Sequence, residues 1–229
     1  MPLEPAEILT LPSSLTRDQM LRSMGIGPGR VVKSRLLRHV DVTIESVRRF
    51  ARPQLAWRMG TVDGMHSALS PSRRLDRYLE GADHVVVLVG TAGRDMDELL
   101  EAEDDPMRKY VLSVAATALT RYTLVYADRE LNRRFPNCST GKPISPGNDG
   151  LPFRLQTDLV GLLPIERLGV AFDDESMAMT PLASITSIIG LGSYQRGDNE
   201  GCASCPSRDC PIRLQPQLSQ EPVHSPILT

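Results

Sequence analysis

Three of the four cysteines in this sequence stand close together near its end. Cys202, Cys205 and Cys210 form a C-x2-C-x4-C pattern, and Cys138 lies earlier, in a segment rich in proline and glycine. A C-x2-C turn can place two thiolates on one metal ion or cluster, and the third thiolate follows a few residues later. We therefore expect a metal or cluster site at these three cysteines. Cys138 is the one cysteine left to complete a set of four.

The identity of the metal stays open at this point. Four thiolates suit either zinc or an iron–sulfur cluster, and ligand softness does not separate the two. A site with an open fourth position and a set of redox-active thiols are the alternatives.

Composition excludes several classes of protein. The 229 residues contain 26 Lys and Arg against 28 Asp and Glu, a formal charge of −2, so we expect no nucleic-acid partner held by a basic surface. No apolar run approaches the ~20 residues that span a bilayer, so we expect no membrane association. The first residues lack the features of a signal peptide, which predicts a cytoplasmic protein, and clustered cysteines in that reducing compartment favour metal or redox chemistry.

Other groups that could do chemistry are better interpreted as structure. Residues 25–29 contain three glycines but follow no strand, which favours a turn between helices over a phosphate loop. Residues 90–93 lie between a strand and a helix, where a tight turn is expected. The acidic residues 173–175 have no nucleophile partner and predict a solvated turn. His39 and His84 have no other histidine at the spacing of metal ligands, so we expect both to be structural or exposed.

The elements that must position these groups follow from hydrophobic period and capping signals. Helices are predicted at residues 17–24, 31–50, 71–79, 106–134 and 153–163, and strands at 54–62 (an edge strand), 83–90, 169–172 and 183–190. Residues 135–152 form a long loop, of a length that is usually functional or disordered.

This order of elements predicts the fold class and the domains. Helices before and after separate strands, without regular βαβ alternation, predict a single α+β domain. We place that domain at residues 1–192, an irregular cysteine segment at 193–213, and a disordered tail at 214–229.

Two stretches of the chain carry a resemblance to a known family. They are residues 144–152, Ile-Ser-Pro-Gly-Asn-Asp-Gly-Leu-Pro, and residues 175–186, Glu-Ser-Met-Ala-Met-Thr-Pro-Leu-Ala-Ser-Ile-Thr. Both resemble the reactivation domain of cobalamin-dependent methionine synthase, which binds S-adenosylmethionine. Free-standing relatives of that domain commonly end in C-x2-C-x4-C-P-x-R, as this chain does from Cys202 to Arg213. The resemblance implies an α+β domain with a twisted antiparallel sheet and long helices.

The resemblance also implies a ligand site at the Pro-Gly loop. The family's loop reads Arg-x-x-Pro-Gly-Tyr, whereas Pro143 and Asn148 stand at the Arg and Tyr positions here. An acidic residue of the family's long helix falls on Leu124. The residues that this comparison suggests for S-adenosylmethionine are Lys142, Ser145, Pro146, Gly147, Asn148 and Asp128, the last one helical turn after Leu124.

The function that the resemblance implies is reductive reactivation. The chain would be an accessory protein for a corrinoid-binding methyltransferase that carries cobalamin, using S-adenosylmethionine and a cysteine-ligated cluster that supplies the electron. The alternative is a non-enzymatic binding module that holds structural zinc, has lost S-adenosylmethionine binding, and docks on a corrinoid protein.

Overall fold

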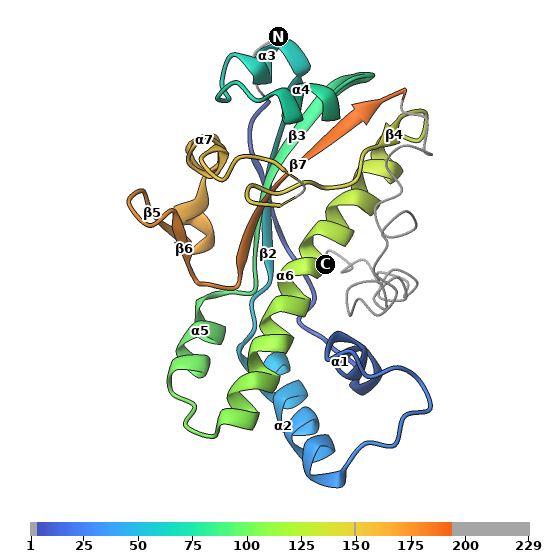
Figure 1. The fold of residues 1–229 in the computed structure, drawn as a ribbon, viewed down its shortest axis with the longest axis vertical. Helices are drawn as coiled ribbons and strands as arrows, with labels where there is room; N and C mark the ends of the chain where they lie inside the picture. The colour runs from blue at the N-terminus through green and yellow to red at the C-terminus, as the bar shows by residue number, and fades with distance from the viewer. Residues whose placement is uncertain (1–3, 149, 194–229) are drawn as a thin grey trace, which may run out of the picture.

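A twisted five-stranded antiparallel sheet forms the centre of the protein (Figure 1). The computed structural model describes residues 4–148 and 150–193. In the order in which they lie side by side, the strands are β1 (Glu7–Thr10), β2 (Gln54–Thr61), β3 (Ala82–Thr91), β7 (Ser184–Gly192) and β4 (Ser139–Thr140). Sheet and helices together make a single α+β domain, which confirms the predicted fold class.

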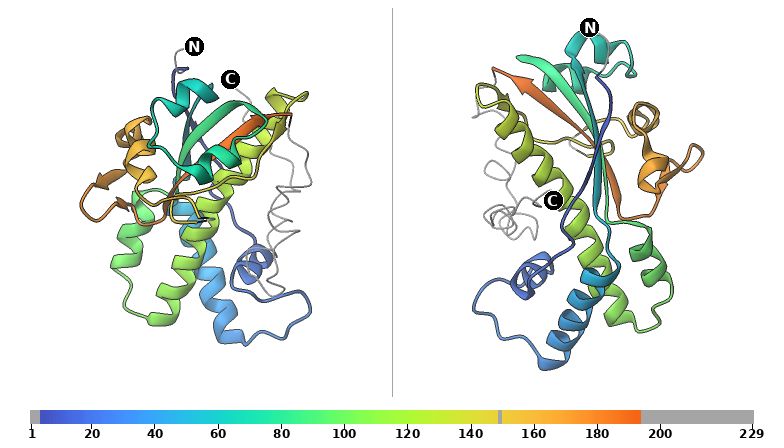
Figure 2. Two further views of the ribbon diagram at one scale, coloured as in Figure 1. Left: turned by 45° about the horizontal axis from the view of Figure 1, so that its top comes forward. Right: turned by 180° about the vertical axis from the view of Figure 1, so that it is seen from behind.

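The central strand β3 is buried on both faces, as its continuous apolar run predicts. Val85, Val87 and Val89 pack into one core cluster, and Val86 and Leu88 pack into another. Because successive side chains of a strand point to opposite faces, this division assigns one cluster to each face of the sheet. The two faces are covered by different parts of the chain, as the right-hand view of Figure 2 shows.

The long helix α6 (Pro106–Arg134) covers one face of the sheet (Figure 2). It begins where the Asp105 side chain accepts hydrogen bonds from the N–H groups of Met107 and Arg108, with Pro106 in the first turn. Its predicted bounds are confirmed. Met107 is exposed where the helix begins, while Ala127 and Leu131 make the contact with the sheet.

Short elements cover the opposite face of the sheet. They are α3 (Val62–His66), α4 (Arg73–Tyr78), α7 (Leu155–Gly161), the 3-10 turn η1 (Ile165–Leu168), and a hairpin of β5 (Ala171–Asp173) and β6 (Ala178–Thr180). Asp173 accepts hydrogen bonds from the N–H groups of Glu175 and Ser176 in that hairpin, so the acidic residues 173–175 form a turn.

A group of helices extends beyond one end of the sheet (Figure 1). It contains α1 (Arg17–Ser23), α2 (Ser34–Phe50), α5 (Arg94–Glu101) and the first half of α6, around a core cluster of their own. Thr16 and Gln19 form a reciprocal capping box at the start of α1, as expected for a Thr at this position. Residues 25–29 connect α1 to α2, which agrees with the predicted turn.

Three predicted elements differ from the structure. Strand 54–62 was expected at an edge, but β2 lies between β1 and β3, because residues 7–10 form a strand that the sequence pattern did not reveal. The helix predicted from residue 71 begins at Arg73, because the Ser72 side chain caps it by accepting from the N–H of Leu75. The strand expected at 169–172 is β5, and its partner β6 was not predicted.

None of the helices in the described part of the chain combines the length and the apolar character that a membrane span needs. The predicted cysteine segment and tail lie outside the described residues, apart from Ser193.

Candidate functional site

The loop that carries the Pro-Gly sequence is attached to strand β7 through its backbone. Thr140 of β4 pairs with Leu191, and the N–H of Gly141 donates to the carbonyl of Gly190 at 2.8 Å. Further along, Ile144 and Ile188 exchange two backbone hydrogen bonds of 3.0 and 2.8 Å. These contacts hold residues 139–144 along β7, and they fix the position of the turn that follows.

The hydroxyl of Tyr78 fills the gap where the loop leaves β7. It donates to the carbonyl of Lys142 at 2.7 Å and accepts from the N–H of Gly190 at 3.2 Å. A Cβ atom at Gly141 would lie 2.7 Å from this hydroxyl, so the close approach requires glycine there. Tyr78 therefore ties α4, the loop and β7 together.

Residues 145–148 form a type II β-turn. The N–H of Asn148 donates to the carbonyl of Ser145 at 3.0 Å, and Gly147 has a φ of 81°. Such a turn favours Pro at its second position and needs a residue with positive φ at its third, which Pro146 and Gly147 satisfy. The N–H of Gly147 donates to the carbonyl of Leu151. The backbone donors of Gly147 and Asn148 are thus used inside the loop.

Buried polar side chains lie on β7 beside this turn. The hydroxyls of Ser145 and Ser187 are 2.5 Å apart and buried. On the other face of β7, the hydroxyl of Thr186 donates to the side-chain carbonyl of Gln156, whose amide donates to the carbonyl of Met177. Sequence reasoning missed Ser187, Thr186 and Gln156. These residues could have been recognised in the sequence, because they are polar residues within otherwise apolar stretches.

Asp128 belongs to a different polar cluster, at the C-terminal half of α6. Its carboxylate accepts from the Thr140 hydroxyl at 2.6 Å and from the Asn132 amide at 3.2 Å. Thr140 and Ile144 pair with Leu191 and Ile188, so about 10 Å of strand separates the Asp128 cluster from the loop position next to the turn. This cluster fastens β4 to α6.

The structure brings some of the predicted site residues together and separates others. Ser145, Pro146, Gly147 and Asn148 form one turn, and Asn148 and Lys142 are exposed. Leu124 packs against the core on the α6 face.

The predicted thiolate site is described only at Cys138. Cys138 is a free, half-buried cysteine, and no group of three or more ligands for a metal occurs among residues 4–148 and 150–193. Cys202, Cys205 and Cys210 lie outside the described residues.

Residues 90–93, between β3 and α5, form a structural turn. The Thr91 hydroxyl accepts from the N–H of Gly93, and Gly93 has a φ of 97° beside the backbone of Arg52. Thr91 and Gly93 are buried, in agreement with the tight turn that the sequence favours.

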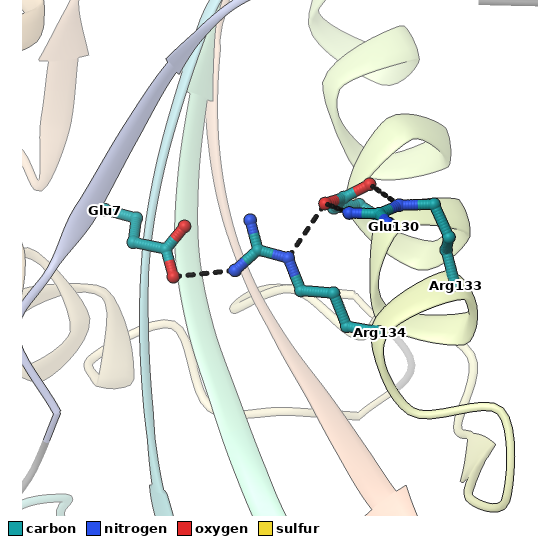
Figure 3. A network of polar contacts seen from close by, with 4 residues as sticks. All are labelled: Glu7, Glu130, Arg133 and Arg134. Carbon is teal, nitrogen blue, oxygen red and sulfur yellow. Dashed lines mark hydrogen bonds and ion pairs between the residues drawn. The ribbon is translucent and has the colours of Figure 1, made fainter.

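An arginine network joins the end of α6 to β1 (Figure 3). Arg134 lies over the Trp57 ring at 5.1 Å and donates to Glu7 at 2.7 Å and to Glu130 at 2.8 Å. Arg133 also donates to Glu130. Hydrogen bonds from Arg133 and then Arg134 lower the pKa of Glu130 from 4.5 to about 2, and the bond to Arg134 lowers the pKa of Glu7. The buried Trp57 is thus a packing residue under a guanidinium.

Comparison with solved structures identifies a related fold. A crystal structure of the MetH reactivation domain bound to AdoHcy superimposes with a TM-score of 0.55 at 14% sequence identity. The match covers 81% of this chain and 78% of that domain. The two share a fold. No protein-family model matches this sequence, and comparison with curated proteins gave no match.

Proposed function

We propose that this chain is an accessory protein for the reductive reactivation of a corrinoid-dependent methyltransferase, and that its Pro-Gly turn binds an S-adenosyl ligand. The observation that carries the proposal is the shared fold with a reactivation domain that was crystallised with AdoHcy. The ligand is suggested by the Pro-Gly motif, and this motif forms a turn that is hydrogen-bonded to the sheet. A rigid turn is the kind of element on which a small-molecule site is usually built.

The chemistry of the turn fits an amino-acid ligand through particular groups. Because the N–H groups of Gly147 and Asn148 bond inside the loop, the backbone would contribute carbonyl oxygens, which suit a ligand amino group. The exposed Asn148 amide and the Lys142 ammonium would meet the ligand carboxylate, with Lys142 acting as a point charge where a bidentate arginine is absent. Ser145, paired with Ser187, would position the turn.

Asp128 has a positioning role in this proposal. One oxygen of the Asp128 carboxylate accepts hydrogen bonds from both Thr140 and Asn132, so its contribution is to hold β4 and the start of the loop.

The bound S-adenosylmethionine would supply the methyl group for the corrinoid and would leave the site as S-adenosylhomocysteine.

The electron would come through a cluster at Cys202, Cys205 and Cys210, with Cys138 as a fourth ligand. Iron and sulfide analysis with EPR on anaerobically purified protein tests this part. Zinc without sulfide would contradict the redox cluster and would favour the alternative, a docking module for a corrinoid protein.

Calorimetric titration of the full chain with S-adenosylhomocysteine and S-adenosylmethionine tests the ligand site. We expect saturable binding that Lys142→Gln weakens about tenfold, because a charge-assisted contact to the carboxylate is lost. Lys109→Gln is the matched control, since Lys109 is exposed on α6 and outside the loop. The absence of heat with either compound, or equal weakening by the control, would contradict the S-adenosyl site.

A further inference from the structure

The outer surface of the helical end carries a concentration of positive charge. Residues 30–40 contain Arg30, Lys33, Arg35 and Arg38 together with His39 and no acidic residue. A chain with a net charge of −2 has no general excess of cations, so this run is a local feature. It spans the connection from α1 and the first turns of α2.

These cations surround a hollow of about 680 Å³. Arg30, Lys33, Arg35 and His39 line it together with apolar groups that include Ile26, Leu36 and Met107. A second hollow of about 390 Å³ adjoins it, shares Arg35 and His39, and adds Arg38. The larger volume lies in the range of small-molecule sites, which usually combine an apolar lining with a few polar groups.

Most of the cations around the hollow have no carboxylate bonded to them in the described part of the chain. Arg30, Lys33, Arg35 and Arg38 make no ion pair within 4.0 Å with any residue in 4–148 or 150–193, whereas Arg17, one helix earlier, pairs with Asp41. Asp105 lines the second hollow and interacts electrostatically with His39 and Arg35, while one oxygen of its carboxylate accepts from two backbone N–H groups at the start of α6. Neighbouring cations without ion pairs repel one another, which lowers the stability of the folded chain, and their combined field favours the binding of an anion.

The lining is also apolar where solvent reaches it. Val31 is fully exposed, and Met107 is 46% exposed. Both residues line the larger hollow beside Arg30 and Lys33. A ligand that fits this surface therefore needs an apolar part next to its negative charges.

We infer that this hollow binds a small phosphate-bearing molecule with an apolar moiety. An arginine side chain can bind two phosphate oxygens through two parallel N–H donors. Arg30 and Arg35, which both line the hollow, can each make this contact. Ile26, Val31 and Leu36 would contact the apolar moiety. A nucleotide and a phospholipid headgroup share this chemistry.

The inferred site is separate from the Pro-Gly turn. The residues that line the hollow come from the α1–α2 connection and the first turns of α2 and α6, whose helices lie at the bottom of Figure 1, whereas the loop that carries the turn is bonded to β7. The inference does not rest on the proposed function, and either can fail without the other.

Binding of ATP and of inorganic tripolyphosphate to the full chain at low salt tests the inference, with calorimetry as the readout. We expect Lys33→Gln/Arg35→Gln to weaken both by about tenfold or more, and binding to fall steeply with added salt. Arg48→Gln is the control, because Arg48 is exposed on the same helix and lies outside both hollows. Val31→Ser should weaken ATP but leave tripolyphosphate unchanged, since only ATP has a part that could contact an apolar lining.

Two further probes identify the source of the phosphate. Vesicles of phosphatidylcholine with phosphatidic acid distinguish a lipid headgroup, and binding to these vesicles alone, lost in the double variant, would support the site with lipid as its ligand. A polyglutamate peptide represents an acidic protein surface. The inference is overturned if polyglutamate binds as well as the phosphates do. It is also overturned if neither ATP nor the vesicles bind, or if the double variant binds like the control. Circular dichroism melting of each variant confirms that it is folded.

Discussion

Arginine side chains beside the two ends of helix α6 stand in different situations. At its C-terminal end, Arg134 is 31% exposed, lies over Trp57 and bonds to two carboxylates. Near its N-terminal end, Arg30 of the α1–α2 connection and Arg35 of α2 line an open hollow and form no ion pair in the described part of the chain. One set of cations joins two elements of the fold, and the other forms no ion pair among the described residues.

The difference follows from what lies beneath each set. The C-terminal end of α6 rests on the sheet, so Arg134 has an aromatic ring below it and Glu7 of β1 beside it. The N-terminal end lies beyond the sheet, among helices whose described carboxylates form no ion pair within 4.0 Å with Arg30, Lys33 or Arg35. The same residue type stabilises a structure only where packing also supplies its partners.

The largest effect is expected midway between the two ends, where α6 touches β3. A Cβ atom at Gly90 would overlap the hydroxyl of Thr123 and lie 2.7 Å from its Cβ. Gly90→Ala should therefore lower the free energy of unfolding by about 3 kcal/mol, measured by urea denaturation. Because this contact positions the whole of α6 against the sheet, the loss of stability should affect the packing at both ends of the helix.

Two variants check that overlap is the cause. Gly90→Ala/Thr123→Ala should recover part of the loss, since the overlapping hydroxyl is removed. Gly161→Ala in α7 meets nothing within 4 Å and should be neutral or stabilising. A Gly90→Ala protein as stable as the wild type would show that α6 does not press on the sheet as described.

The next largest loss of stability is expected when Arg134, at the C-terminal end of α6, is replaced. Arg134→Ala loses the ring contact and both ion pairs, and should cost about 2 kcal/mol of unfolding free energy in urea. Arg133→Ala is the control, because Arg133 bonds to the same Glu130 but is 71% exposed. Its unfolding midpoint should stay near that of the wild type. Equal losses in the two variants would contradict the distinction between a packed and a solvated arginine.

The same network predicts a pH dependence. The pKa of Glu130 is lowered from 4.5 to about 2 in the folded protein, so its contribution to stability is complete above pH 4.5 and is lost as the pH falls toward 2. The lowered pKa of Glu7 acts in the same direction. Urea midpoints measured across this range should decline less steeply in Glu130→Gln than in the wild type. Parallel declines would show that Glu130 does not carry the effect.

The smallest effect on stability is expected at the N-terminal end. Lys33→Gln/Arg35→Gln removes two cations that form no ion pair in the described chain, so the melting temperature should stay close to that of the wild type. Differential scanning calorimetry at low salt measures it. A clear loss of stability would mean that these cations are structural, and the comparison between the two ends would then fail.

Sequence reasoning succeeded where the signal is local. The bounds of α6, the cap at Thr16, the burial of β3 and the Pro-Gly turn depend on residues close in the chain. It failed where two distant segments meet. Strand β1 is four residues long and half exposed, so nothing in its own pattern marks it, and it exists because β2 lies beside it.

The candidate site divides in the same way. The sequence alone predicted a long loop over residues 135–152, and Pro146 and Gly147 have the backbone preferences that the type II turn within this loop needs. Only the tertiary structure decided that this turn is anchored on β7 beside Ser187, that Asp128 belongs to a separate cluster, and that Arg134 is paired while Arg35 forms no ion pair among the described residues. Backbone preference acts within a few residues, whereas hydrogen-bond partners and desolvation come from segments far apart in the sequence.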